Sequence, residues 1–308
     1  MIVCCGEALI DMLPRKTGDG EEAYVPFVGG AVFNTAIALG RLGAPTGFFT
    51  GLSTDVFGQQ LRDALVASTV DPRYIHFADR PTTLAFVKLT NGQASYMFYD
   101  ENTAGRMLSE ADLPDLAPDV AALHFSCISL IPEPCGSTYE ALMRREHTGR
   151  VMMFDPNIRK DFIPDRKTHL ARMKRMLQMA DIVKLSDEDL AWFGETGEPA
   201  EIARRWLDAG PKLVVITMGA KGIAGFSRNG DVLVEGERVL VKDTVGAGDT
   251  VNAGILAYLS DHGLLTKSGI ASLSRDQVRG ALAFANRAAA VTVSRAGANP
   301  PWRDELAS

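Results

Sequence analysis

Asp243-Thr244-Val245-Gly246-Ala247-Gly248-Asp249 connects a strand predicted over 237–241 to a helix predicted over 247–259, and the α/β interpretation of this chain rests on that connection. Its glycines let the backbone turn sharply, so that several N–H groups and the positive end of the helix converge on one point. Asp249, in the first helical turn, is expected to be ionised by the helix dipole and able to accept a proton. The pattern indicates an anion hole beside a base, although simple tight turns share it.

Two other phosphate-binding patterns do not fit this segment. A Walker A loop requires Gly-Lys-Ser/Thr, which is missing. A dinucleotide-binding fingerprint needs an acidic residue at the end of a second strand, and none follows. An NAD-dependent oxidoreductase is therefore disfavoured.

A second glycine-rich segment, Gly29-Gly30-Ala31-Val32-Phe33-Asn34, opens a helix predicted over 32–42. Paired glycines allow a ligand to approach the backbone closely, and Asn34 can both donate to and accept from hydroxyl groups. Asp11 follows the first predicted strand, at the edge of the sheet where α/β folds hold their ligands. Taken singly, a surface position for Asn34 and a loop position for Asp11 remain open.

Continuous apolar runs alternate with helical patterns along the chain. Such runs predict strands buried on both faces, and the alternation predicts a parallel, doubly wound sheet with helices on both sides. A long helix over 275–293 follows near the C-terminus. Strands are predicted over 2–10, 46–52, 121–129, 151–155, 182–185 and 213–218, and helices over 58–68, 135–146, 167–179, 188–193 and 200–209 as well as those above.

Two alternating segments, 82–90 and 93–99, interrupt this pattern. Asn91-Gly92 lies between them, and this pair is preferred in type I′ hairpin turns. A further short strand is predicted over 23–28. Antiparallel strands within a parallel fold indicate a small sheet that forms a lid. We predict one domain, residues 1–308, with lid strands from about 12–28 and 81–104.

The lid strands carry apolar side chains on a sheet too small to bury both faces. A second subunit often completes such a sheet, so a homodimer through the lid is favoured, and coverage of the active site alone is the alternative. The side chains concerned are Leu84, Phe86, Val87, Tyr96 and Phe98.

The composition is that of a globular protein in a reducing cytoplasm. Of 308 residues, 46% are apolar and 23% charged, and the net charge is −6. Without a basic run or a long apolar segment, neither nucleic acid nor a membrane is expected as a partner. The N-terminus lacks the basic region of a secretory signal. The four cysteines (Cys4, Cys5, Cys127 and Cys135) lack zinc-site spacing and are expected to be buried thiols.

In this order and separation, the two glycine-rich segments resemble the signatures of the phosphofructokinase-B (ribokinase-like) family of carbohydrate kinases. The resemblance covers nearly the whole chain. It implies a three-layer α/β/α sandwich with a mostly parallel sheet and a small β-sheet lid, and ATP-dependent transfer to a sugar hydroxyl. Further matching segments are 6–11, 155–159 (Asp-Pro-Asn-Ile-Arg), 214–219 with Gly222, Asn286 and 295–298.

The resemblance also implies roles for individual residues. Asp249 would be the base, and Arg159 would lie near the transferred phosphate, with a solvated surface charge as the alternative for Arg159. The anion hole would be formed by Gly246, Ala247 and Gly248. The sugar would be held by Asp11, Gly29, Gly30, Asn34, Tyr99 and Asp100. The ATP cleft would be lined by Lys184, Ser186, Thr217, Gly219, Gly222 and Asn286, together with Gly246 and Gly248.

The metal-assisting motif departs from the family pattern. Members commonly carry Asn-x-x-Glu after a central strand, where it helps to organise Mg²⁺, whereas this chain has Ser186-x-x-Asp189. Mg²⁺ keeps several waters that can bridge to a shorter acid, so Asp189 or its neighbour Glu188 would assist it through water. Some members bind a monovalent cation such as K⁺ near the second signature, where Asp243 is the candidate ligand.

Asp100 bears on the choice of sugar. Many members, 2-keto-3-deoxygluconate kinases among them, have Arg here, which in acid-sugar kinases helps to hold a carboxylate. An aspartate would repel an anionic substrate by about 4 kcal/mol at ~4 Å and an effective dielectric near 20, so a neutral sugar is favoured. The segments 99–102 and 184–188 most resemble bacterial fructokinases, and D-fructose is the predicted acceptor. Ribose, another ketose or a nucleoside remain open, 2-keto-3-deoxygluconate is less favoured, and a catalytically silent sugar or nucleotide sensor is the non-enzymatic alternative.

Overall fold

The computed structural model describes residues 1–90 and 93–306. Their core is a ten-stranded sheet in the order β14-β13-β12-β11-β10-β9-β1-β4-β5, with β6 paired to β4. All neighbours pair in parallel except β12 with β13 and β13 with β14. The strands are β1 (Ile2–Cys5), β4 (Thr46–Ser53), β5 (Val70–Asp71), β6 (Ile75–Ala78), β9 (Ala122–Ser126), β10 (Val151–Asp155), β11 (Ile182–Ser186), β12 (Leu213–Thr217), β13 (Ile223–Ser227) and β14 (Gly230–Val234).

Helices cover both faces of this sheet, so the predicted three-layer sandwich is confirmed. Successive strand residues alternate between two apolar clusters, as the period of two in a strand requires. One face packs against α1 (Ala31–Arg41), α2 (Val56–Ala67), α7 (Ala247–Asp261), α8 (Lys267–Ala271) and α9 (Arg275–Val293). The other packs against α3 (Cys135–Glu146), α4 (Arg166–Met179), α5 (Asp187–Trp192) and α6 (Pro199–Ala209).

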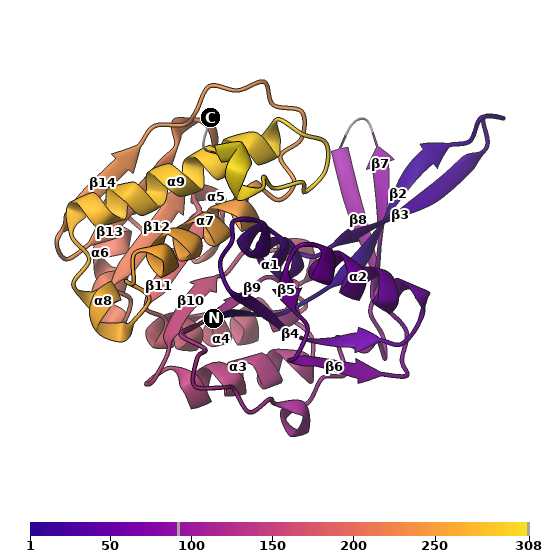
Figure 1. The fold of residues 1–308 in the computed structure, drawn as a ribbon, viewed down its shortest axis with the longest axis horizontal. Helices are drawn as coiled ribbons and strands as arrows, with labels where there is room; N and C mark the ends of the chain where they lie inside the picture. Colours follow the sequence, from indigo (N-terminus) through magenta and orange to yellow (C-terminus); the bar gives the residue numbers. More distant parts are fainter. Residues whose placement is uncertain (91–92, 307–308) are drawn as a thin grey trace.

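The lid is a separate four-stranded sheet in the order β3-β2-β7-β8, which projects from one side of the α/β body (Figure 1). Its strands are β2 (Leu9–Lys16), β3 (Glu22–Gly29), β7 (Leu84–Thr90) and β8 (Gln93–Tyr99). β2 pairs with β7 in parallel, and the other two pairings are antiparallel. The predicted hairpin strands are confirmed, while the Asn91-Gly92 turn lies outside the described residues.

Two strand predictions were wrong. The apolar run 2–10 is not one strand, because β1 ends at Cys5 and the chain passes through Gly6, Glu7 and Ala8 into lid strand β2. Residues on both sides of this break are buried, so hydrophobicity does not mark it. The segment 237–241 is irregular, and Leu240 is 81% exposed, because the chain has already left the sheet at Val234.

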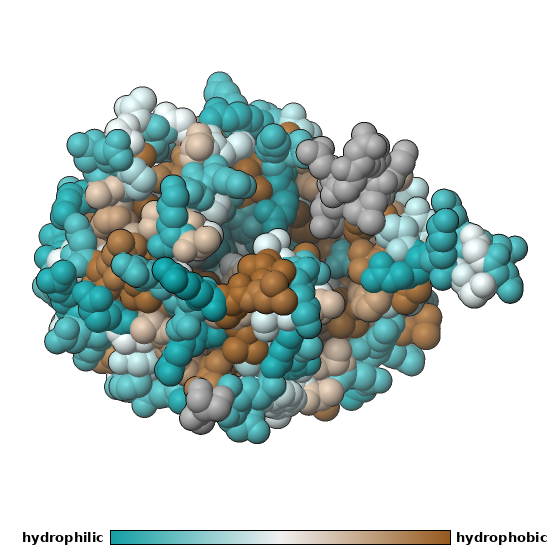
Figure 2. All heavy atoms as spheres, turned by 90° about the horizontal axis from the view of Figure 1, so that it is seen from above, coloured by the Kyte–Doolittle hydropathy of each residue, from teal (hydrophilic) through white to brown (hydrophobic). Residues whose placement is uncertain are grey.

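The surface seen in Figure 2 is mostly polar, with separate apolar patches. All four cysteines are buried as free thiols. Among the described residues, no helix is both long enough and apolar enough to cross a membrane.

Candidate active site

The glycine-rich turn before α7 forms as its sequence predicts. Gly246, the N-cap of α7, has a φ of 78°, a left-handed conformation that glycine adopts without strain. Added there, a Cβ would lie 2.8 Å from the Cβ of Ala298, so a side chain would also be crowded. The Ala247 amide donates to the Thr244 carbonyl at 3.3 Å. Among the described backbone groups, the amides of Gly246 and Gly248 donate to no carbonyl, which leaves them available to an anion.

Asp249 lies in the first turn of α7, and its side chain meets the other glycine-rich segment. Its Oδ2 accepts a hydrogen bond from Nδ2 of Asn34, on α1, at 3.0 Å. The residue is only 8% exposed, and burial raises the pKa of Asp249 to about 7, while Asn34 and the Lys184 ammonium oppose the shift. The expectation that the helix dipole dominates was therefore wrong, because loss of hydration outweighs it. A carboxyl group with a pKa near neutrality is well matched to general-base catalysis.

Asp11 and the paired glycines complete the sugar side of the site. Asp11 lies on lid strand β2, where burial raises its pKa to about 6. Gly29, beside it on β3, makes room for its carboxylate, because a Cβ there would lie 2.2 Å from Oδ2 of Asp11. Gly30 has a φ of 109° and caps α1. A cavity of about 330 Å³ is lined by Asp11, Gly30, Asn34 and Asp249 together with Gly246, Gly248, Lys184 and Arg159.

Arg159 follows β10 and lines this open cavity, and its side chain is also exposed to solvent. Burial alone would lower its pKa, but Cys127 and the carboxylates of Asp249 and Asp189 raise it. Its guanidinium therefore stays charged next to the base, where it can attract a phosphate. The structure brings this predicted residue into the site.

Glu7 is a cavity residue that was not among the predicted ligands. It lies in the turn between β1 and β2, where Oε1 accepts from the amides of Ala31 at 2.8 Å and Val32 at 3.3 Å. The carboxylate thus caps the N-terminus of α1, and burial raises its pKa. An acidic residue inside an apolar run was the available signal. Cys127, Ile128, Asn157 and Phe162 also line the cavity and were not predicted as ligands. Cys127 and Asn157 have positive φ, which no sequence pattern indicates.

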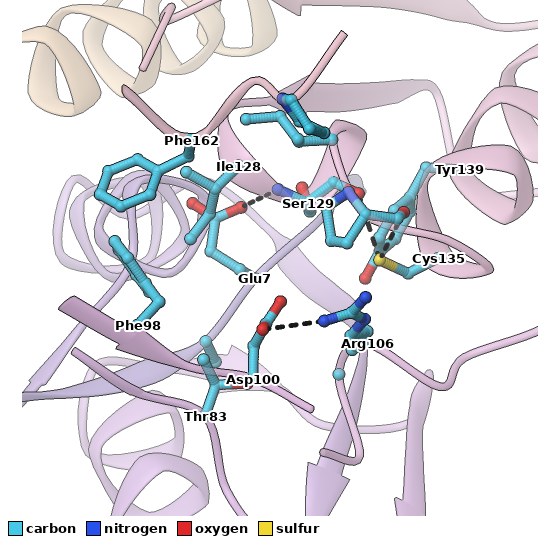
Figure 3. Close-up of a pocket in the computed structure, with 15 residues that line it drawn as sticks. Glu7, Thr83, Phe98, Asp100, Arg106, Ile128, Ser129, Cys135, Tyr139 and Phe162 are labelled. Atoms are coloured by element: carbon cyan, nitrogen blue, oxygen red, sulfur yellow. Dashed lines mark hydrogen bonds and ion pairs between the residues drawn. The ribbon is translucent and has the colours of Figure 1, made fainter. Parts of the chain in front are cut away.

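The lid contributes Phe98 and not Tyr99 to the cavity. Phe98 packs edge-to-face against Phe162 of the main body, with ring centroids 4.5 Å apart. Tyr99 points to the opposite face of the lid and is 55% exposed. Adjacent β-strand residues alternate between faces, so the prediction for Tyr99 was displaced by one position. Asp100 lines an adjoining hollow of about 330 Å³ (Figure 3) and not the cavity that contains Asp249, and its Oδ1 pairs with Arg106 at 3.0 Å.

Most residues expected in the nucleotide cleft lie outside both hollows. Thr217 ends β12, and Gly219 and Gly222 form the next turn, both with positive φ. Asn286, on α9, donates to the Glu235 carbonyl at 2.9 Å. Ser186 is the N-cap of α5. The Lys184 side chain points into the protein, where its Nζ donates to Oδ2 of Asp155 at 3.0 Å.

The candidate metal-assisting acids have structural partners. Oδ1 of Asp189 accepts from the Ile158 amide at 2.8 Å, and its Oδ2 accepts from the Ser186 hydroxyl at 2.8 Å. Glu188, next to it, is exposed. Asp243 joins two loops by accepting from the amides of Val245 at 3.0 Å and Gly297 at 2.9 Å. The described residues contain no group of three His, Cys, Asp or Glu side chains placed to hold a metal ion.

Known proteins are similar to this chain in sequence and in architecture. Residues 1–305 match the model of the pfkB family carbohydrate kinase. A fructokinase of Rhizobium leguminosarum bv. trifolii is 59% identical over 279 residues, which cover 91% of this chain and 86% of that protein. The structure of a Xylella fastidiosa fructokinase with bound ATP matches with a TM-score of 0.89 at 28% identity, over 99% of this chain and 96% of the other. A Vibrio cholerae O395 fructokinase in fructose, ADP and calcium ion bound form gives a TM-score of 0.86 at 28% identity, over 99% and 97%.

Both glycine-rich signatures thus meet at Asp249, in a chain that matches one family model almost from end to end. An acidic side chain at a helix N-terminus, next to free amides and a cation, suits transfer of a phosphoryl group to a hydroxyl. The chain belongs to the pfkB family of carbohydrate kinases, and it is an ATP-dependent phosphotransferase that acts on a sugar hydroxyl.

Proposed function

We propose that this protein is a fructokinase that transfers the γ-phosphoryl group of ATP to a hydroxyl of D-fructose. One observation carries the proposal: the buried Asp249 carboxyl group, hydrogen-bonded to Asn34, shares a cavity with Asp11 and Arg159. The similarity of the whole chain to the fructokinase of Rhizobium leguminosarum bv. trifolii favours fructose over other sugars.

In the proposed reaction, the sugar lies between the lid and α1, with hydroxyl groups on Asp11 and Asn34. The reacting hydroxyl gives its proton to Asp249 as it attacks the γ-phosphorus, and the bond from that phosphorus to the ADP oxygen breaks. The amides of Gly246 and Gly248 stabilise negative charge on the transferring group, and Arg159 attracts it. Phe98 and Phe162 close the apolar side of the cavity, which limits access of water as a competing acceptor.

We infer that a divalent ion, Mg²⁺ in the cell, acts bound to the ATP phosphates rather than to a protein carboxylate. Asp189 does not fit as a direct ligand, because it is buried and its two oxygens accept three hydrogen bonds from protein groups, whereas each oxygen of Asp243 accepts one. Exposed Glu188 fits contact through water only. The Asp243 carboxylate keeps acceptor capacity at the junction of two loops, which fits a K⁺ site there.

The experiment that tests the proposal is a panel of acceptors with ATP, in which ADP release is measured with and without EDTA. D-fructose is expected to give the highest kcat/KM, well above ribose, other ketoses, nucleosides and 2-keto-3-deoxygluconate, and EDTA is expected to abolish turnover. A higher kcat/KM for another acceptor would reassign the substrate. ATP binding with no turnover of any acceptor would identify a sensor and would contradict the proposed reaction.

We also propose that the protein is a cytoplasmic homodimer joined through the outer face of the lid. Across that face Phe86 packs edge-to-face with Tyr24 at 5.0 Å and with Tyr99 at 5.4 Å. Tyr24, Met97 and Tyr99 are all exposed there, which is unusual for large apolar side chains on one small sheet. Four buried free thiols fit a reducing compartment.

A further inference from the structure

A charged pair lies directly beneath the catalytic turn, inside the protein. Nζ of Lys184, on β11, donates to Oδ2 of Asp155, on the neighbouring strand β10, at 3.0 Å. Asn252, on α7, donates to the same oxygen at 2.7 Å. Both charged side chains are almost completely buried, on the sheet face that α7 covers. Burying an ion pair is unfavourable unless its geometry and hydrogen bonds compensate, so its place beneath the active site calls for an explanation.

The Lys184 ammonium touches the turn itself. A Cβ added at Gly248 would lie 2.9 Å from Nζ, closer than real side chains approach. Gly248 is therefore the residue that lets this cation reach the backbone of the anion hole. Lys184 also lines the cavity that contains Asp249.

The charges around the pair keep the lysine protonated. Burial would lower the pKa of Lys184, but Asp155, Asp189 and Asp249 together raise it. His124, on β9, is fully buried beside it, and burial together with Lys184 lowers the pKa of His124 to about 3, so this imidazole is neutral. The positive charge next to the turn therefore belongs to Lys184.

We propose that Lys184 is a positioning residue of the phosphoryl transfer: its ammonium group, held by Asp155, supports the Gly248 turn that carries the anion-hole amides and Asp249. This inference rests on the transfer to a sugar hydroxyl proposed above. Lys184 acts through Gly248 and Asp249 and does not lie among the residues expected to hold the sugar.

The two members of the pair act on Asp249 with opposite signs. Lys184 lowers the pKa of Asp249 and Asp155 raises it. Asn34 on α1, Arg159 after β10 and Cys127 after β9 also act on the Asp249 carboxyl group. The carboxyl groups of Asp11, on β2, and of Glu7, between β1 and β2, line the same cavity.

Opposite signs make a crossed experiment possible, in which kcat/KM for D-fructose is measured from pH 5 to 9. Lys184→Met should lower kcat about 10- to 100-fold, and it should move the acidic limb of the profile upward by about one pH unit. Asp155→Asn should move the same limb downward, because it removes a negative charge near the base. The double variant Lys184→Met/Asp155→Asn, which has no uncompensated charge, tests the same point if either single variant folds poorly. The acidic limb of the double variant's pH profile should move to higher pH, by less than in Lys184→Met.

Lys267→Met is the matched control, because Lys267 also forms an ion pair with a buried aspartate, Asp181, at 2.7 Å. Asp181 directly precedes β11, the strand that carries Lys184. It should lower stability and leave the acidic limb unchanged. Limbs that move the same way in both single variants, or a double variant within threefold of wild-type kcat with an unmoved limb, would overturn the inference. Wild-type turnover in the same assay separates that failure from failure of the proposed function itself.

Discussion

The Asp249 carboxyl group is both the proposed base and a source of instability. Its pKa is 3.8 in a free side chain and about 7 in the folded protein, so folding disfavours the ionised form. Below about pH 3 the group is protonated in both states and contributes almost nothing. As the pH rises from 4 through 7, the unfolded chain ionises first, and the folded state loses up to about 4 kcal/mol relative to it.

Asp249→Asn should therefore stabilise the protein while it removes catalysis. We expect kcat to fall about 10³-fold or more. We expect a higher urea midpoint than wild type at pH 8 and a much smaller difference at pH 4, measured by urea unfolding at several pH values. Asp63→Asn, at an exposed position on α2, is the control and should change neither quantity. A stability difference that does not vary with pH would contradict the assigned burial effect.

How well single residues could be predicted depended on whether they lie in a compact motif. Asp249, Asn34 and Gly30 belong to glycine-rich segments whose local geometry follows from the sequence, and they reach one cavity. Phe98 was named only in the alternative in which the lid covers the active site, because the choice between it and Tyr99 depends on which face of β8 meets the main body. Glu7 could not either, because its role depends on the N-terminus of α1, which folds against it from 24 residues away.

At the level of elements, the two ends of α7 carry similar glycines in different surroundings. Gly246 at the N-terminus and Gly263 just past the C-terminus both have left-handed φ, 78° and 65°. A Cβ at Gly246 would crowd Ala298, whereas a Cβ at Gly263 would meet nothing within 4 Å. Only the first end lines the cavity that contains Asp249.

Gly246→Ala and Gly263→Ala should each lower the free energy of unfolding by about 1 kcal/mol through backbone strain, and Gly246→Ala by more because of the contact with Ala298. Only Gly246→Ala should also lower kcat, by about tenfold or more, because the amides of the anion hole shift. Thermal unfolding and steady-state kinetics of both variants check this. Equal loss of activity in the two would show that the position of the turn does not govern transfer.

Prediction of elements was reliable where hydrophobicity changes at a boundary. Strands β4, β9, β10, β11 and β12 and the long helices between them were predicted, whereas the short elements β5, β6 and α8 were not. The split of 2–10 into β1 and β2 was missed, because the chain moves from one buried sheet to another without a polar break. The apolar residues of 237–241 resemble a strand, but they have no neighbouring strand to pair with after β14.

For the molecule as a whole, the exposed aromatic row on the lid predicts assembly. Changing Tyr24 and Tyr99 to Ser together should convert a dimer into a monomer, because it removes the centre of the apolar face. Analytical ultracentrifugation measures the change, and Val66→Ser, at an exposed apolar position on α2, is the control. A monomeric wild-type protein would contradict the proposed dimer. The assignment of residues 1–308 to a single domain stays a prediction.

The hydrogen bond between Asn34 and Asp249 joins positions 215 residues apart. At roughly 5–20 residues per second, a ribosome needs about 10 to 40 seconds to make the intervening chain. During that interval α1 has emerged, but α7, which covers much of its apolar side, has not been synthesised. The nascent chain therefore exposes the apolar face of α1 for most of its synthesis. A ribosome-associated chaperone is expected to shield this face until the C-terminal quarter of the chain has been synthesised.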